Sequence, residues 1–222
     1  MILQQFQNNW IFIIPFLLSI FYCFTIHEFA HAFVAYKQGD NTAKDAGRLT
    51  LNPLAHIDLL GFLMFIFAGF GWAKPTPVNP NNFKDGKRGD NLVSIAGILA
   101  NLASVILFGI IFKIVFPDLN PVLLQMDFNF YPSVNLLSYF LSSLIVFNLT
   151  LAIFNLLPIP PLDGSHILFN KLSDRFINFK IFLATNGVYI LLALLILENF
   201  GIYTISYLFY FAQVFLALFF KA

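Results

Sequence analysis

The sequence predicts an all-α polytopic membrane protein, with about five transmembrane helices, one re-entrant segment and a functional site inside the bundle. The first observation is composition: 59% of the 222 residues are hydrophobic and only 10% are charged, whereas soluble proteins average about 25% charged residues. The second is a set of long apolar segments, and the third is a group of ionisable residues inside one of them. We expect no nucleic-acid partner, because the net charge is only +1.

A helix that crosses a membrane needs about 20 predominantly apolar residues. Five segments meet this requirement, and the last two are expected to form a helical hairpin. They are residues 10–36, 91–116, 133–157, 179–197 and 201–219.

Segment 57–73 (IDLLGFLMFIFAGFGWA) is apolar but short, is interrupted by glycines and is bordered by prolines. These features fit a re-entrant segment better than a span. We therefore expect a single membrane-embedded domain over residues 1–222, with a core at 10–170 and a C-terminal hairpin at 179–219. The apolar N-terminus lacks the basic region and cleavage site of a signal peptide, so it is expected to be a retained helix.

Lysine and arginine residues predict the orientation, because cytoplasmic loops carry an excess of both. Loops 37–56, 74–90 and 158–178 are basic, whereas loop 117–132 has two aspartates and no basic residue. If 57–73 is re-entrant, all three basic loops lie on one side. This predicts a multi-pass protein of the cell membrane, with the N-terminus outside and the C-terminus in the cytoplasm.

Residues 26–32 read I-H-E-F-A-H-A inside the first apolar segment. On a helix, His27 and His31 lie on one face, one turn apart, where both imidazoles can bind a single Zn²⁺. Glu28 is not a ligand in this pattern and serves as the general base. Ionisable residues are costly at membrane depth, so their presence here indicates a functional site. The alternative is that the three line a water-filled interior.

A catalytic zinc needs a third protein ligand and an open position. Residues 155–164 read N-L-L-P-I-P-P-L-D-G, and Asp163 is the candidate ligand because the prolines end the preceding helix and Gly164 permits a close approach. Asp163 reaches the side of His27 and His31 only if 57–73 is re-entrant. The charge pattern and the ligand geometry thus favour the same topology, with the active site towards the cytoplasm.

Four more polar residues are weaker candidates. Asn155 could contact substrate or an oxyanion, or could equally cap a helix end. Asn101, in A-G-I-L-A-N, has the same two roles open, with interhelical hydrogen bonding favoured. For His56 a local turn contact is favoured over a role near the zinc, and for His166 a ligand role is disfavoured because a fourth protein ligand would close the site.

H-E-F-A-H in a first membrane helix followed by N-L-L-P-I-P-P-L-D-G-S resembles the site-2 protease family of intramembrane zinc metalloproteases. The stretches GRLTLNPLAHIDLLG (47–61) and GWAKPTPVNP (71–80) resemble a small bacterial branch of that family without a PDZ or CBS domain. The resemblance implies one Zn²⁺ per chain, held by His27, His31 and Asp163, with Glu28 as the general base.

The resemblance also implies an endopeptidase that cleaves within or near transmembrane segments of membrane proteins. Its partners would be a transmembrane substrate and the lipid bilayer, and the sequence indicates no oligomeric state. A helical substrate must unwind before it is cut, and the proline-rich residues 71–80 could offer it an extended edge. Two alternatives are a catalytically idle zinc scaffold that binds membrane helices and a transporter with a metal site.

Overall fold

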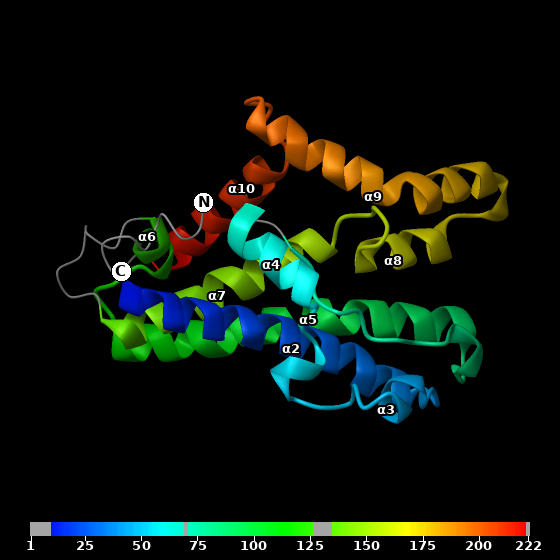
Figure 1. The fold of residues 1–222 in the computed structure, drawn as a ribbon, viewed down its shortest axis with the longest axis horizontal. Helices are drawn as coiled ribbons and strands as arrows, with labels where there is room; N and C mark the ends of the chain where they lie inside the picture. The colour runs from blue at the N-terminus through cyan, green and yellow to red at the C-terminus, as the bar shows by residue number, and fades with distance from the viewer. Residues whose placement is uncertain (1–9, 69–70, 127–134, 221–222) are drawn as a thin grey trace.

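The computed structural model describes residues 10–68, 71–126 and 135–220, and within these ranges every named element of secondary structure is a helix (Figure 1). The predicted all-α polytopic class is confirmed. Four helical stretches among the described residues are long and apolar enough to cross a membrane: Trp10–Lys37, Gly86–Val115, Leu136–Asn155 and Asp174–Glu198.

The elements follow one another in a simple order. They are η1 (Trp10–Phe12), α2 (Ile13–Lys37), α3 (Thr42–Asp45), η2 (Pro53–Ala55), α4 (Leu59–Ala68), η3 (Pro80–Asn82), α5 (Gly86–Val115), α6 (Pro121–Met126), α7 (Leu136–Asn155), α8 (Asp163–Lys171), η5 (Asp174–Phe176), α9 (Ile177–Asn199) and α10 (Ile205–Phe219).

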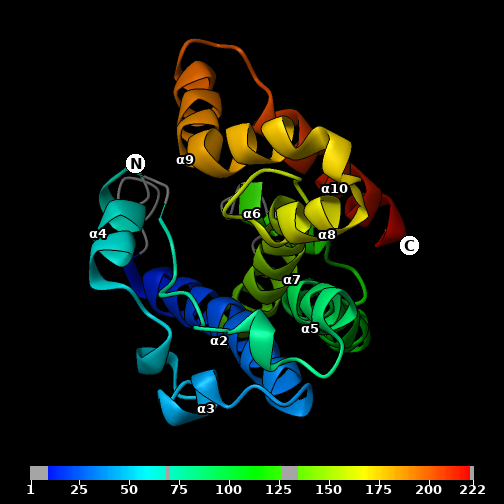
Figure 2. The ribbon, with the colours of Figure 1, turned by 90° about the vertical axis from the view of Figure 1, so that its right-hand side faces the viewer.

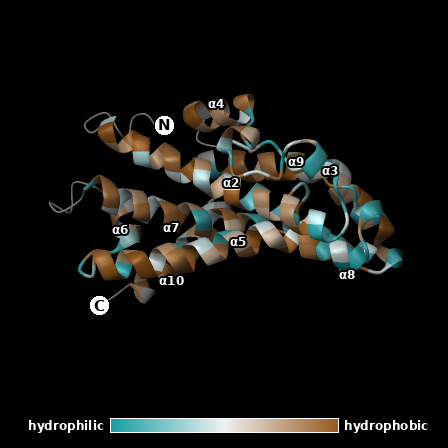
Figure 3. Cartoon of the chain, turned by 90° about the horizontal axis from the view of Figure 1, so that it is seen from below, coloured by the Kyte–Doolittle hydropathy of each residue, from teal (hydrophilic) through white to brown (hydrophobic). Residues whose placement is uncertain are grey.

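Helices α2, α5 and α7 pack against one another and form the centre of the molecule (Figure 2). Hydroxyl groups join them: Ser19 Oγ of α2 lies 3.3 Å from the Phe140 carbonyl of α7, and Tyr22 Oη of α2 lies 3.0 Å from Ser104 Oγ of α5. Such contacts matter within a bilayer, where apolar burial gives little preference for helix over lipid. Figure 3 shows hydrophobic residues along most of these helices and hydrophilic residues gathered around α3 and α8.

The two described arms of segment 57–73, residues 57–68 and 71–73, meet at their ends, which is the arrangement that a re-entrant segment requires. Helix α4 has only 10 residues, and Ile57 pairs with Ala73 in an antiparallel bridge that joins the two ends of the segment. Gly61 and Gly71 permit this approach, because a Cβ on either would collide with a backbone oxygen of the opposite arm. Residues 71–79, called the return segment below, then run in extended form towards η3.

The C-terminal region differs from the prediction of a hairpin with the C-terminus beside the basic loops. Helix α10 has 15 residues, fewer than the roughly 20 that a span needs, and the chain advances from α9 to α10 without folding back (Figure 1). Phe220 packs with Phe112 and Leu119, at the end of the bundle opposite the basic loops. Hydropathy alone did not distinguish a second span from a shorter helix packed on the bundle.

Candidate metal centre

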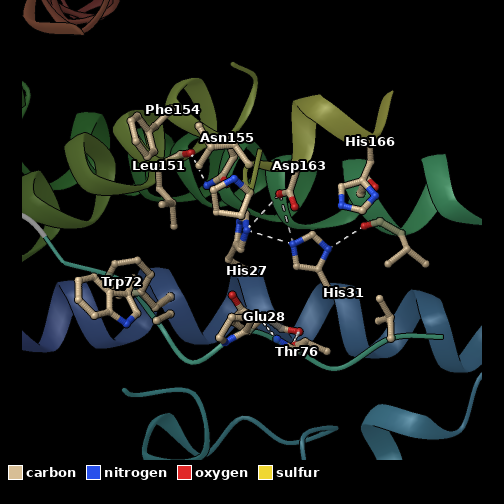
Figure 4. A pocket seen from close by; sticks show the side chains of 18 of the residues that line it. His27, Glu28, His31, Trp72, Thr76, Leu151, Phe154, Asn155, Asp163 and His166 are labelled. Atoms are coloured by element: carbon tan, nitrogen blue, oxygen red, sulfur yellow. Dashed lines mark hydrogen bonds and ion pairs between the residues drawn. The ribbon is translucent and has the colours of Figure 1, made fainter. Parts of the chain in front are cut away.

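Two histidines of α2 and an aspartate of α8 converge inside the bundle (Figure 4). His27 and His31 are one turn apart and both are buried, and their Nε2 atoms are 3.0 Å from each other. Asp163 Oδ2 lies 3.3 Å from each of these nitrogens. Among the described residues, this is the group of histidine, cysteine and acidic side chains that could hold a metal ion.

The local sequence explains how Asp163 reaches α2. The prolines after α7 prevent the helix from continuing, and the chain turns back so that α8 begins at Asp163. Gly164 packs against the backbone at Leu156, where a Cβ would collide with the Leu156 carbonyl. Helix α8 is held to α5 through Asn170, whose Nδ2 donates to Asp90 Oδ2 over 2.7 Å.

The donor set fits zinc. His31 Nδ1 lies 2.7 Å from the Val93 carbonyl, which can only accept a hydrogen bond, so this nitrogen carries a proton and leaves Nε2 as the ligating atom. Asp163 Oδ2 is buried, and no described residue satisfies it with a hydrogen bond. Tetrahedral coordination with bonds of about 2.0–2.1 Å separates ligand atoms by about 3.3 Å. The three atoms are therefore spaced as zinc ligands are.

Glu28 lies beside these three residues and is held by the return segment. The Thr76 backbone N–H donates to Glu28 Oε2 over 2.7 Å, and Thr76 Oγ1 donates to the Glu28 carbonyl over 3.0 Å. The return segment is itself fixed at Lys74, whose N–H donates to the His56 carbonyl over 2.9 Å and whose carbonyl accepts a hydrogen bond from Arg48. Glu28 is therefore oriented by a well-anchored backbone.

A cavity of about 310 Å³ opens at the site, and Glu28 and the three candidate ligands line it. One wall is apolar, and the return segment forms another. The lining includes Phe24, Leu151, Phe154, Trp72 and Thr76. The space is large enough for a short stretch of extended peptide beside the candidate ligands.

The weaker candidates occupy different surroundings. Asn155 lines the cavity, with its Nδ2 donating to the Leu151 carbonyl over 3.0 Å. His56 is fully buried and its Nε2 donates to the Thr50 carbonyl over 2.8 Å, which is the local contact that the sequence favoured. His166 lines the cavity but its Nδ1 faces Asp90 at 3.5 Å. Asn101 is fully buried beneath His27, with Oδ1 2.7 Å from His27 Nδ1.

The sequence did not indicate the role of Thr76 in holding Glu28 or that of the Val93 carbonyl in orienting His31. It also did not indicate a role for Asn148, whose Oδ1 accepts a hydrogen bond from Asn101 Nδ2 over 2.7 Å. Asn148 carried a usable signal, since it is an amide in an apolar helix just as Asn101 is. The Val93 contact and the Thr76 contact with the Glu28 carboxylate use backbone atoms of those two residues, and such contacts leave no mark in residue type.

Asp40 fixes the far end of the return segment. It is fully buried and accepts hydrogen bonds from the Asn79 backbone N–H at 2.8 Å, Asn82 Nδ2 at 2.8 Å and Thr42 Oγ1 at 2.6 Å. Burial alone would raise the pKa of this carboxyl, but the donors hold the pKa below its ordinary value. The folded protein therefore favours the ionised form.

We expect Asp40→Asn to lower the free energy of unfolding by about 1.5–3 kcal/mol at pH 7, the usual value of hydrogen bonds to a charged group. Because the folded-state pKa is lowered, the stabilisation is complete above the unfolded-state pKa of about 3.9 and is lost as the pH falls through the folded-state value. Thermal unfolding of both proteins in detergent between pH 7 and pH 3 measures this. The gap in melting temperature should narrow below about pH 4, and a gap independent of pH would contradict the assignment.

Comparison with known proteins identifies the family. The model of peptidase family M50 matches residues 125–197, a range that includes Asp163 but not His27 or Glu28. The YwhC protein of Bacillus subtilis, whose name classes it as a proposed zinc metalloprotease, is 45% identical over 157 residues, which are 70% of this chain and 68% of YwhC. The chain belongs to peptidase family M50. The resemblance to the site-2 protease family is confirmed.

Two further relatives of this M50 chain are mycobacterial. Rip2 of Mycobacterium tuberculosis is 34% identical over 143 residues, and Rip2 of Mycolicibacterium smegmatis is 30% identical over 144 residues. Each alignment covers 63% of this chain and 50% of the relative, and both names class the proteins as proposed zinc metalloproteases. No solved structure matches the chain. The M50 chain is therefore a multi-pass membrane protein and a zinc metalloprotease.

Proposed function

We propose that this M50 chain is an intramembrane zinc metalloendopeptidase that hydrolyses peptide bonds in or near transmembrane segments. The observation that carries the proposal is the convergence of His27, His31 and Asp163, with Glu28 beside them, in a cavity between membrane-spanning helices. Pure metal binding has no use for Glu28. A substrate that meets this cavity from the bilayer is most simply a membrane protein.

In the proposed mechanism, His27, His31 and Asp163 hold one zinc per chain. Zinc, when bound, acts as a Lewis acid that polarises the scissile carbonyl and lowers the pKa of water. A Glu28 carboxylate oxygen accepts the proton of the attacking water and later returns it to the leaving amine. Asn155, at the cavity wall, is proposed to contact the substrate backbone or the developing oxyanion.

The return segment is proposed to bind the unwound substrate. It is extended and lines the cavity through Trp72, Ala73 and Thr76. An extended peptide can pair with such an edge by strand addition, in which main-chain hydrogen bonds supply affinity. The edge would lie beside the catalytic residues, so that pairing and cleavage occur in one place.

The proposed location is the cell membrane, with the basic end of the bundle in the cytoplasm. The cavity opens nearer that end, because His31 lies six residues before the end of α2 at Lys37, about 9 Å along a helix with a rise of 1.5 Å per residue. The N-terminus would lie outside. Phe220 lies at the same end as Leu119, so the C-terminal end of α10 would lie outside as well.

Asp163→Ala tests the metal centre. With one of three ligands removed, we expect zinc binding to weaken by at least about 100-fold, more than the loss of an outer partner causes, and cleavage of a transmembrane peptide to disappear. The measurement is zinc per purified chain, with cleavage in detergent alongside. His166→Ala is the control, since His166 lines the same cavity without joining the three ligands, and it should keep its zinc. Full zinc content in Asp163→Ala would contradict the proposed ligand set, and zinc-loaded wild type that cuts no membrane peptide would favour a zinc scaffold.

A further inference from the structure

A chain of amide side chains links three helices to the metal centre. Asn148 Nδ2 of α7 donates to the Leu144 carbonyl over 2.7 Å, and Asn101 Nδ2 of α5 donates to Asn148 Oδ1 over 2.7 Å. Asn101 Oδ1 then lies 2.7 Å from His27 Nδ1 of α2. Asn101 and Asn148 are both fully buried. A buried amide is retained only where its hydrogen bonds are satisfied, and these two satisfy each other and the histidine.

These hydrogen bonds, which run from the Leu144 carbonyl through Asn148 and Asn101 to His27, are called the relay below. Their direction is set at the Leu144 carbonyl. The Leu144 carbonyl can only accept, so the Asn148 amide nitrogen must face it and Asn148 Oδ1 must face Asn101. Asn101 then turns its nitrogen to Asn148 and its oxygen to His27. The Cys23 carbonyl, 3.2 Å from Asn101 Nδ2, independently favours the same orientation. His27 Nδ1 is therefore the donor, which leaves Nε2 with its lone pair towards Asp163.

The two histidines are oriented by different means. His31 Nδ1 donates to a backbone carbonyl, that of Val93, whereas His27 depends on side chains. An amide side chain can flip, so Asn101 alone would not fix which nitrogen of His27 carries the proton. Asn148 Oδ1 removes this freedom together with the Cys23 carbonyl, and its hydrogen bond to Asn101 Nδ2 is the shorter of the two. Substitution can therefore remove the hydrogen bond that orients His27 but not the one that orients His31. The His27 contact can be altered at two positions, Asn101 and Asn148.

We propose that Asn101 and Asn148 are positioning residues that hold His27 as the Nδ1–H tautomer, with Nε2 ready to bind the metal. This rests on the proposed function, because it assumes that His27 is a ligand. The competing explanation is that the amides only join α2, α5 and α7. That explanation predicts lower stability without a specific loss of zinc affinity, whereas outer partners of ligating histidines typically contribute about 10–100-fold in metal affinity.

The experiment is competition for zinc between the purified full chain and a chelator of known affinity, with thermal unfolding of each apo protein alongside. We expect Asn101→Leu to weaken zinc binding by about 10–100-fold. Asn101→Asp should largely restore it, because a carboxylate oxygen still accepts from His27 Nδ1–H. Asn148→Leu should cause a smaller loss, and none when added to Asn101→Leu, because Asn148 acts only through Asn101.

Ser104→Ala is the matched control. Ser104 lies on α5 near Asn101 and joins α5 to α2 through Tyr22, but it does not touch the histidines. Its loss should lower stability and leave zinc affinity unchanged. Wild-type zinc affinity in Asn101→Leu, or failure of Asn101→Asp to recover it, would overturn the relay. If Asp163→Ala then also binds zinc normally, the proposed metal centre is wrong as well. If Asp163→Ala loses zinc, only the proposed role of Asn101 and Asn148 is wrong.

Discussion

Replacement of Glu28 with glutamine is expected to lower the rate of peptide cleavage by about 10²–10⁴-fold, the usual contribution of a positioned acid–base group, while zinc stays bound. Glutamine has the same shape as glutamate, and its side-chain oxygen can still accept the hydrogen bond that the Thr76 N–H makes to Glu28 Oε2. It cannot accept a proton from water. The change therefore removes the chemistry and leaves the architecture in place.

The measurement is single-turnover cleavage of a transmembrane peptide in detergent, together with the zinc content of each protein. Glu198→Gln is a matched control. Glu198 also lies on a helix and its carboxylate accepts hydrogen bonds from backbone N–H groups, those of Thr204 and Ser206, but it does not line the cavity. Glu198→Gln should cleave at the wild-type rate. Loss of zinc in Glu28→Gln would make Glu28 a ligand rather than a base, and cleavage within threefold of wild type would remove it from the mechanism.

The grouping of the candidate ligands could be predicted in part because its central features are local. His27 and His31 are brought together by the helical repeat alone, and polar residues are rare enough in apolar segments that Asp163 after a proline-rich turn stood out. The structure adds how Asp163 arrives, through the close packing of Gly164 on the Leu156 backbone. That contact is possible because Gly164 has no Cβ. The sequence shows the glycine but does not show which backbone segment packs against it.

Other features depend on how helices are rotated and placed against one another. Asn101 of α5 and Asn148 of α7 are 47 residues apart in the sequence, and no short pattern indicates that they meet. The prediction that α10 spans the membrane was wrong for a related reason. Its apolar sequence suits lipid and protein contacts equally, and hydropathy does not predict the packing of Phe220 against Phe112. The path of segment 57–73 was easier to predict, because the segment is short for a membrane span and its glycines allow its two ends to approach each other closely.

Gly97→Ala is expected to weaken zinc binding by at least about tenfold, comparable to the loss of an outer partner of a ligand, and to reduce cleavage accordingly. Gly97 of α5 packs directly on the two imidazoles, and a Cβ there would lie 2.5 Å from His31 Nε2 and 2.6 Å from His27 Cε1. Carbon atoms in packed interiors approach other atoms to about 3.5–4.0 Å. Either α5 must move away from α2 or the rings must turn.

Both ways of relieving the contact disturb the ligands. Turning His27 breaks its hydrogen bond to Asn101, and turning His31 breaks its hydrogen bond to the Val93 carbonyl. Moving α5 pulls both partners away together. Helix propensity works in the opposite direction, since alanine is favoured over glycine within a helix by about 0.8–1.0 kcal/mol. A loss of zinc affinity would therefore be steric in origin.

Gly109→Ala is the control on the same helix, and chelator competition for zinc with both apo proteins unfolded thermally is the measurement. A Cβ at Gly109 would lie 3.3 Å from the edge of the Phe220 ring, which can turn, so zinc affinity should be unchanged. Wild-type zinc affinity in Gly97→Ala would mean that the rings have more room than this packing allows. Gly97 and Asn101 lie one turn apart on α5, as His27 and His31 do on α2, so in the proposed centre α5 sets both the space for the two candidate ligands and the proton position of one of them.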